Sequence, residues 1–197
     1  MNLNIDITGI ILETEHLILR PFEKNDLNDF NEYARVPGVG EMAGWIHHQS
    51  IEESGKILEM FIYGKNTFAI LDKISGKVIG SFGIEKYDEK LVGEEFKNLK
   101  CIEIGYVLSK DFWGRGYMTE AGLAVLKYCY EVLSLDAVFC GYFKRNTQSM
   151  RVTEKLGFKY LLDHITTTRY ETEEDAILTV LYRSEWENEK NVQFNFR

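Results

Sequence analysis

Residues 103–122 constrain the fold of this chain more than any other stretch. The stretch opens with an apolar and aromatic run, residues 104–108, which predicts a buried strand, and it closes with the start of an amphipathic helix. The turn between them carries Gly114 and Gly116. A glycine-bearing turn that leads into a helix leaves backbone N–H groups unpaired beside the positive end of the helix dipole. The pattern predicts a phosphate or pyrophosphate site, with an ordinary tight turn as the alternative.

Missing motifs narrow the choice of phosphate ligand. The dinucleotide fingerprint needs a third glycine three residues after Gly116, where Thr119 stands. The P-loop needs Gly, four residues, then Gly-Lys and Ser or Thr, and no stretch of the chain supplies it. A nucleotide-binding protein is therefore disfavoured.

A second motif follows the predicted strand at residues 137–143. Residues 146–149 read Asn-Thr-Gln-Ser and residues 154–158 read Glu-Lys-Leu-Gly-Phe, with Asn146 as helix cap and Gly157 as helix stop. In this order, Trp-Gly-Arg-Gly-Tyr, Thr-Glu-Ala and Asn-x-x-Ser resemble the GCN5-related N-acetyltransferase (GNAT) superfamily, in particular its ribosomal-protein N-terminal (RimJ/RimL-like) branch. The resemblance covers roughly residues 14–187. One departure is Asp111, where the superfamily commonly has Gln or Arg, so backbone N–H groups would hold the anion.

The predicted architecture is α/β in class, one domain over residues 1–197 with its core at about 14–187. The resemblance implies a GNAT-like acyl-CoA N-acyltransferase fold, a mixed central sheet of six to seven strands flanked by about four helices. Alternation and turn signals predict strands at 15–22, 67–72, 77–87, 103–108, 137–143, 159–166 and 176–183. Helices are predicted after Asn25, after Ser50, at 117–133 and after Asn146. Residues 88–99 are predicted to form an exposed loop, and the chain to end in a polar tail.

The resemblance also implies an acetyl-CoA site without a metal. The pantetheine arm of the cofactor would lie between two central strands and form hydrogen bonds with main-chain groups. The phosphates of the cofactor would contact the glycine turn and nearby basic side chains. The implied cofactor-binding residues are Tyr106, Val107, Leu108, Trp113, Gly114, Arg115, Gly116, Tyr117, Met118, Thr119, Asn146, Ser149 and Lys155.

Two residues are candidates for acid–base chemistry. Glu103 lies among apolar neighbours on the central strand, where burial would raise its carboxyl pKa toward the range of a general base. A glutamate that faces solvent or pairs with a lysine is the alternative for Glu103. Many superfamily members use a tyrosine as acid four residues after the position of Ser149, and here Thr153 stands there. The resemblance therefore gives the role to Ser149, as a hydrogen-bond donor to the departing thiolate.

The acceptor is the least constrained part of the prediction. The glycine-rich connector at 36–48 corresponds to the superfamily's acceptor border, so Trp45, His47 and His48 are candidates for substrate binding. Surface or capping histidines are the ordinary alternative, and adjacent histidines lack metal-ligand spacing. The acceptor could be the N-terminal amine of a (ribosomal) protein or a small amine such as a polyamine, amino sugar or amino acid. A non-catalytic acyl-CoA-binding module is the alternative from a different class.

Composition sets limits on partners and compartment. The 197 residues carry a formal charge of −8, which disfavours nucleic-acid or acidic-membrane partners and suits a cationic amine. Cys101, Cys129 and Cys140 are odd in number and lie in apolar runs, as reduced core thiols of a cytoplasmic protein would. No signal peptide or membrane span is expected, and monomer and homodimer stay open.

Overall fold

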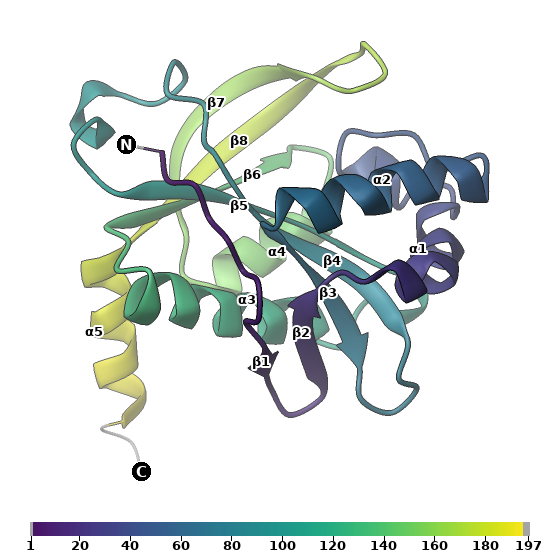
Figure 1. Cartoon of the computed structure of the whole chain (residues 1–197). Coiled ribbons are helices and arrows are strands. Elements are labelled where there is room, and N and C mark those ends of the chain that lie inside the picture. The colour runs from purple at the N-terminus through teal and green to yellow at the C-terminus, as the bar shows by residue number, and fades with distance from the viewer. Residues whose placement is uncertain (1, 195–197) are drawn as a thin grey trace.

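A single mixed sheet forms the centre of the protein (Figure 1). The structure is a computed structural model that describes residues 2–194, with side chains described for residues 2–188. In these residues the sheet has eight strands in the order β1-β2-β3-β4-β5-β6-β8-β7. They are β1 (Leu12–Glu13), β2 (Leu17–Pro21), β3 (Thr67–Asp72), β4 (Val78–Glu85), β5 (Cys101–Leu108), β6 (Ala137–Phe143), β7 (Lys159–Thr167) and β8 (Glu173–Tyr182). The predicted mixed sheet is confirmed, and the strand beyond the predicted number is β1, whose two residues are too short to show an alternation.

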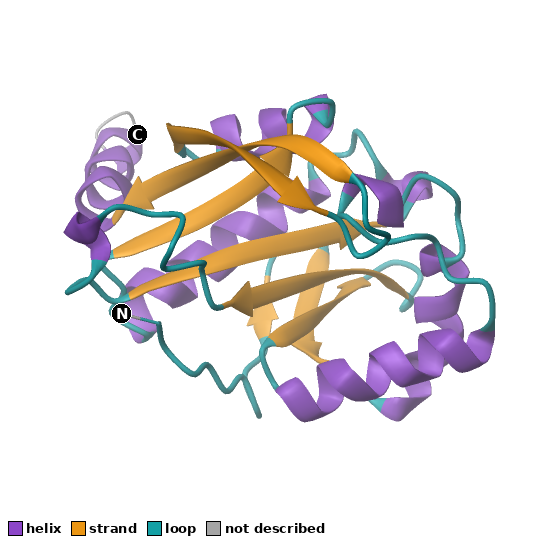
Figure 2. Cartoon of the chain, turned by 90° about the horizontal axis from the view of Figure 1, so that it is seen from above, coloured by secondary structure: helices purple, strands orange, loops and turns teal. Residues whose placement is uncertain are grey.

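The two faces of the sheet carry different helices. The helices of the described chain are α1 (Leu27–Ala34), α2 (Ile51–Gly64), α3 (Tyr117–Lys127), α4 (Thr147–Lys155) and α5 (Arg183–Phe194). On β3, Ala69 packs in a cluster with residues of α1 and α2, whereas Phe68 and Ile70 pack in the cluster that contains α3. Because successive strand residues point to opposite faces, α1 and α2 cover one face and α3 covers the other. Figure 2 shows helices on both sides of the strands.

Three local predictions differ from the structure. The charged segment 88–99 is not simply exposed, because Phe96 is fully buried and its ring lies 4.9 Å from that of Phe139. The predicted polar tail contains α5, whose Trp186 is buried and stacks on Tyr130. Val132 is 66% exposed instead of buried, because the end of the predicted helix is a π-helix that turns it away from the core. A lone aromatic in a charged segment has no periodicity by which it could be recognised.

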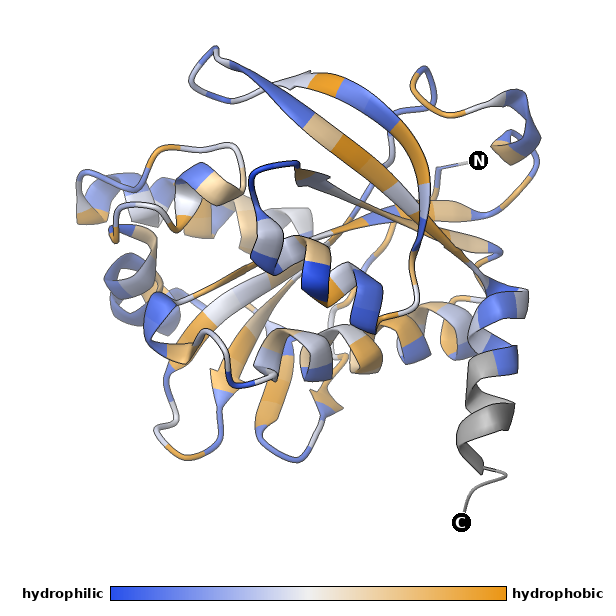
Figure 3. Ribbon diagram, turned by 180° about the vertical axis from the view of Figure 1, so that it is seen from behind, coloured by the Kyte–Doolittle hydropathy of each residue, from blue (hydrophilic) through white to orange (hydrophobic). Residues whose placement is uncertain are grey.

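The parallel strands β5 and β6 separate halfway along their length. Their pairing ends at Ile104 and Cys140, although β5 continues to Leu108 and β6 to Phe143. Beyond that point each strand keeps its other neighbour, β4 for β5 and β8 for β6. A gap therefore opens between the second halves of β5 and β6. Beyond it the hairpin of β7 and β8 extends past the rest of the sheet, with hydrophilic and hydrophobic residues mixed along its strands (Figure 3).

Candidate functional site

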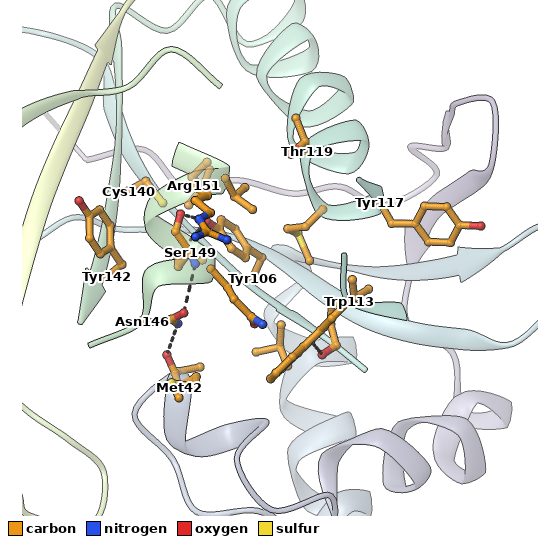
Figure 4. Close-up of a pocket in the computed structure, with 18 of the residues that line it drawn as sticks. Met42, Tyr106, Trp113, Tyr117, Thr119, Cys140, Tyr142, Asn146, Ser149 and Arg151 are labelled. Atoms are coloured by element: carbon orange, nitrogen blue, oxygen red, sulfur yellow. Dashed lines mark hydrogen bonds between the residues drawn. The ribbon is translucent and has the colours of Figure 1, made fainter. Parts of the chain in front are cut away.

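A cavity of about 490 Å³ occupies the gap between β5 and β6, and we call it the first cavity. Its walls come from β5, from the glycine turn with the start of α3, and from α4 (Figure 4). The predicted cofactor-binding residues that line it are Tyr106, Val107, Leu108, Trp113, Gly114, Gly116, Tyr117, Met118, Thr119, Asn146, Ser149 and Lys155. Arg115 is not among the lining residues, because its guanidinium lies over the Phe112 ring and donates a hydrogen bond to the Asp111 carbonyl.

The glycine turn presents the N-terminus of α3 to the first cavity. Gly114 and Gly116 have φ angles of +77° and +83°, in the left-handed region that favours glycine. A Cβ added to either residue would meet no atom within 4 Å, so backbone conformation and not crowding selects glycine. Gly116 is the N-cap of α3, and no side chain of the described residues caps this terminus. Its N–H groups are therefore available to an anionic ligand.

Asn146 holds α4 in place beside the cavity. Its Oδ1 accepts a hydrogen bond from the Ser149 N–H at 3.1 Å, and its Nδ2 donates to the Met42 carbonyl at 3.2 Å (Figure 4). Both ends of the amide are thus engaged by the protein. Asn146 is the helix cap that the sequence predicted, and it also joins α4 to the connector between α1 and α2.

Ser149 lies next to the Tyr106 hydroxyl. The distance between Ser149 Oγ and Tyr106 Oη is 2.9 Å, and both residues line the first cavity (Figure 4). Thr153 is buried and donates from Oγ1 to the Met150 carbonyl at 2.8 Å. Among the α4 hydroxyl groups, that of Ser149 is the one in the cavity lining.

Glu103 lies where β5 and β6 separate. Burial first of all, and then the negative charges of Glu85 and Asp88, raise the pKa of its carboxyl group to about 7. A Cβ added to Gly141 on β6 would lie 3.1 Å from Glu103 Oε1, so the missing side chain leaves room for the carboxylate. Glu103 can therefore exchange a proton near neutral pH at the point where β5 and β6 begin to separate.

A second cavity of about 300 Å³ adjoins the first at Glu103. The residues that line both cavities are Met42, Ala43, Glu103, Gly141 and Tyr142. Residues of the β7–β8 hairpin complete the second cavity, among them His164, Thr166 and Arg169. The Arg169 N–H donates to the Gly44 carbonyl at 2.8 Å and so connects the hairpin to the connector. Glu103 thus lies between two compartments that are built from different parts of the chain.

Trp45, His47 and His48 lie outside the lining residues of both cavities. His48 is buried, with Nδ1 2.8 Å from Ser54 Oγ. His47 Nδ1 lies 2.7 Å from Glu41 Oε1. The contacts of their side chains lie within the connector and between the connector and α2, and a contact with the acceptor stays a prediction for all three residues.

Other residues of the same connector border the cavities. Met42 and Ala43 line both, and Gly44 lines the second. None of the three carries a titratable group, so the sequence offered no chemical signal by which to select them.

Two further features are absent from the part of the chain that the structure describes. No group of three or more His, Cys, Asp or Glu residues there could hold a metal ion. No helix among these residues is long and apolar enough to cross a membrane.

Solved structures with the same fold include three informative examples. An acetyltransferase (GNAT family) from Bacillus anthracis superposes with a TM-score of 0.77 at 22% identity, covering 89% of this chain and 100% of that one. The ribosomal-protein-S5-alanine acetyltransferase from Vibrio fischeri superposes with a TM-score of 0.67 at 22% identity, covering 90% of this chain and 99% of that one. The spermidine N-acetyltransferase from Vibrio cholerae, solved with CoA and spermine, superposes with a TM-score of 0.70 at 15% identity. The superposition covers 88% of this chain and 99% of that one. At these identities the comparison establishes the fold alone.

Sequence comparison establishes the family. The chain is 27% identical over 153 residues to the uncharacterized N-acetyltransferase p20 of Bacillus licheniformis, covering 75% of this chain and 82% of that protein. Residues 16–159 match the family model described as acetyltransferase (GNAT) domain, which is more than half of the chain. The protein therefore belongs to the GNAT family of N-acetyltransferases.

Proposed function

We propose that this chain transfers the acetyl group of acetyl-CoA directly to a primary amine, with the cofactor in the first cavity and the amine in the second. The observation that carries the proposal is the position of Glu103, which lines both cavities and has a pKa of about 7. GNAT enzymes use acetyl-CoA, and the spermidine N-acetyltransferase of the same fold was solved with CoA. The uncapped N-terminus of α3 suits the pyrophosphate of such a cofactor.

Each group has a distinct part in the reaction. Glu103 takes a proton from the protonated amine, directly or through a water molecule, and the neutral amine attacks the thioester carbonyl carbon. The nitrogen then loses a second proton to solvent as the amide forms. The β6-facing edge of β5 beyond Ile104 has no strand partner, so a backbone N–H there is free to stabilise the developing oxyanion. The C–S bond then breaks, and the CoA thiolate accepts a hydrogen bond from Ser149.

The acceptor is a protein N-terminal amine or a small amine. The fold is shared with a ribosomal-protein acetyltransferase and with a spermidine N-acetyltransferase, so it is compatible with both classes. The formal charge of −8 favours a cationic acceptor. A non-catalytic acyl-CoA-binding module would not need Glu103 and Ser149 beside one cavity. The unpaired cysteines are buried thiols, as in a cytoplasmic protein.

The test is acetyl-CoA turnover, followed as free-thiol release, against N-terminal peptides, polyamines, amino sugars and amino acids. CoA binding is measured by calorimetry on the same protein. Turnover stimulated by one acceptor class supports the proposal and names the substrate. Tight CoA binding without turnover on any amine would favour a binding module, and absent CoA binding would refute the placement of the cofactor.

A further inference from the structure

We infer that the Tyr106 phenol positions the Ser149 hydroxyl group, so that the serine proton is directed at the sulfur of the departing CoA. This inference rests on the proposed acetyl transfer. It gives the Tyr106 side chain a part in the reaction, whereas the sequence predicted only main-chain contacts from this residue. Tyr106 is a positioning residue in this scheme, because it acts through Ser149.

The geometry fixes the two hydroxyl groups against each other. Tyr106 Oη lies 2.9 Å from Ser149 Oγ and 3.4 Å from the Ser149 carbonyl oxygen. The Tyr106 ring packs against Phe82, which is fully buried, with 5.5 Å between ring centroids. Ser149 lies in the first turn of α4, which the Asn146 cap holds in place. A rigid strand and a capped helix thus hold the hydroxyl pair, as Figure 4 shows.

The phenol has one proton, and we infer that it donates this proton to Ser149 Oγ, the nearer of the two Ser149 oxygens. Burial raises the pKa of Tyr106 well above its usual value, so the phenol keeps its proton at any working pH. The two described oxygen atoms within hydrogen-bond distance of Tyr106 Oη both belong to Ser149, and the buried Cys140 thiol also lies within hydrogen-bonding reach of the phenol. When Ser149 Oγ accepts from the phenol, its own proton is left to point elsewhere. No other described residue shares a hydrogen bond with Ser149 Oγ, so this proton can point into the cavity.

The contact with Tyr106 makes the Ser149 hydroxyl group a stronger hydrogen-bond donor toward the CoA sulfur. A hydroxyl group that accepts a hydrogen bond becomes a better donor through its own proton. The Ser149 proton then stabilises negative charge on sulfur as the C–S bond breaks. Tyr106 keeps its proton throughout. One proton of the ammonium group goes to Glu103, the second leaves to solvent as the amide forms, and the thiolate takes its proton from solvent on release. Burial also raises the pKa of the neighbouring Cys140 thiol, which therefore stays neutral beside the thioester.

The decisive measurement is the ionisation of the thiol of bound CoA, followed by the ultraviolet absorbance of the thiolate. It is made on the wild type, Tyr106→Phe, Ser149→Ala and the double variant. A donor aimed at sulfur favours the thiolate, so each single substitution lowers the ionisation constant of bound CoA, by about 3- to 10-fold for Tyr106→Phe. The double variant is expected to match Ser149→Ala. An unchanged constant in Tyr106→Phe would overturn the inference.

The double variant separates two roles of the phenol. If removing the Tyr106 hydroxyl group still lowers the ionisation constant when Ser149 is alanine, the phenol contacts sulfur directly and the inference is wrong. Phenylalanine keeps the ring that packs against Phe82, so CoA affinity should be preserved. Tyr160→Phe on β7 is the matched control, since Tyr160 is 63% exposed and lines neither cavity.

Turnover distinguishes this inference from the function on which it rests. In Tyr106→Phe, kcat should fall by about 3- to 10-fold with the KM for acetyl-CoA unchanged. Wild-type protein that neither binds CoA nor releases thiol would refute the proposed function. Wild-type protein that turns over, beside a Tyr106→Phe variant with the same kcat and the same bound-thiol ionisation, would refute only the role of Tyr106.

Discussion

The two cavities that meet at Glu103 are built in different ways. The first takes a large part of its lining from two short stretches, residues 103–108 of β5 and residues 112–114 and 116–119 of the turn and α3. The second combines residues 42–44, 141–143, 164, 166–169 and 176, which lie far apart in the chain. A contiguous segment can be recognised as a motif, whereas a site assembled from distant segments depends on strand pairing that no local pattern encodes. The segments of the first cavity can therefore be recognised in the sequence, whereas those of the second cavity cannot.

The two cavities also differ in the groups that they offer to a ligand, backbone groups in one and side chains in the other. The glycine turn offers backbone N–H groups, so its chemistry depends on φ angles more than on residue identity. The second cavity is bordered by side chains of the connector and the hairpin. Substitutions should consequently divide into those that affect the cofactor, those that affect the acceptor, and those at Glu103 that affect the reaction itself.

The largest effect is expected from Glu103→Gln, which removes the carboxylate that lines both cavities and that we propose as the base. We expect kcat to fall by about 10²- to 10⁴-fold with CoA affinity preserved, because general-base catalysis contributes that much. With a pKa of about 7, Glu103 in the wild type must lose its proton to act, so kcat/KM should decline as pH falls below about 7. A pH–rate profile of both proteins checks this. A variant with wild-type kcat would remove Glu103 from the mechanism.

The same substitution should raise stability at alkaline pH. The Glu103 pKa rises from an ordinary 4.5 to about 7 in the fold, so between these values the folded state holds a proton that the unfolded state has lost. Stability is thus lost as pH rises through this window. At pH 8 Glu103→Gln should be more stable than the wild type by up to about 3 kcal/mol, and near pH 4 the two should be equal. Urea denaturation at both pH values measures the difference.

The next effect tests the cofactor side alone. Gly116→Val forces a β-branched residue into a left-handed backbone conformation with φ +83° and disturbs the N-terminus of α3. We expect CoA affinity to fall by about 100-fold or more. Gly76→Val is the matched control, because Gly76 has φ +70°, a Cβ there meets nothing within 4 Å, and it lies in the turn between β3 and β4. An equal loss in both variants, measured by calorimetry, would attribute the effect to general strain.

The parts of the fold that the sequence predicts correctly are local ones. The strand, glycine turn and helix of residues 103–122 and the cap at Asn146 are confirmed, because each is a local pattern with a local cause. The mixed sheet followed from the order of such patterns. The roles proposed for Glu103 and Ser149 stay predictions until the variants are measured.

The acceptor side is less accessible to local patterns. The imidazoles of His47 and His48 contact Glu41 and Ser54 in the fold, and their contact with an acceptor stays a prediction. Met42 and Ala43 border both cavities without any chemical signal in the sequence. The contact between Tyr106 and Ser149 joins residues 43 positions apart, and only the packing of α4 against the sheet creates it.

A smaller effect should come from crowding the Glu103 carboxylate. In Gly141→Ala the new Cβ would lie 3.1 Å from Glu103 Oε1, so the carboxylate must shift by a few tenths of an ångström. Because catalysis is sensitive to the placement of reacting groups, kcat should fall by about 5-fold while CoA affinity is preserved. Gly55→Ala in α2 is the control, since its Cβ would meet Leu27 at an ordinary 3.9 Å. Unchanged turnover in Gly141→Ala would show that Glu103 has room to move.

The smallest effect concerns an attachment of the connector that borders the second cavity. The Arg145 guanidinium donates to the Glu41 carbonyl at 2.8 Å and pairs with Glu174, so it joins the connector to β8. Its side chain is 39% exposed, which limits the energy of the ion pair. Arg145→Ala should raise the acceptor KM by about 3-fold and leave CoA affinity unchanged, because the connector loses one of several attachments. Lys144→Ala, which breaks the neighbouring pair with Asp163, is the control for loss of charge. A rise in the Kd for CoA with an unchanged acceptor KM would assign Arg145 to the cofactor side and remove the division between the two compartments.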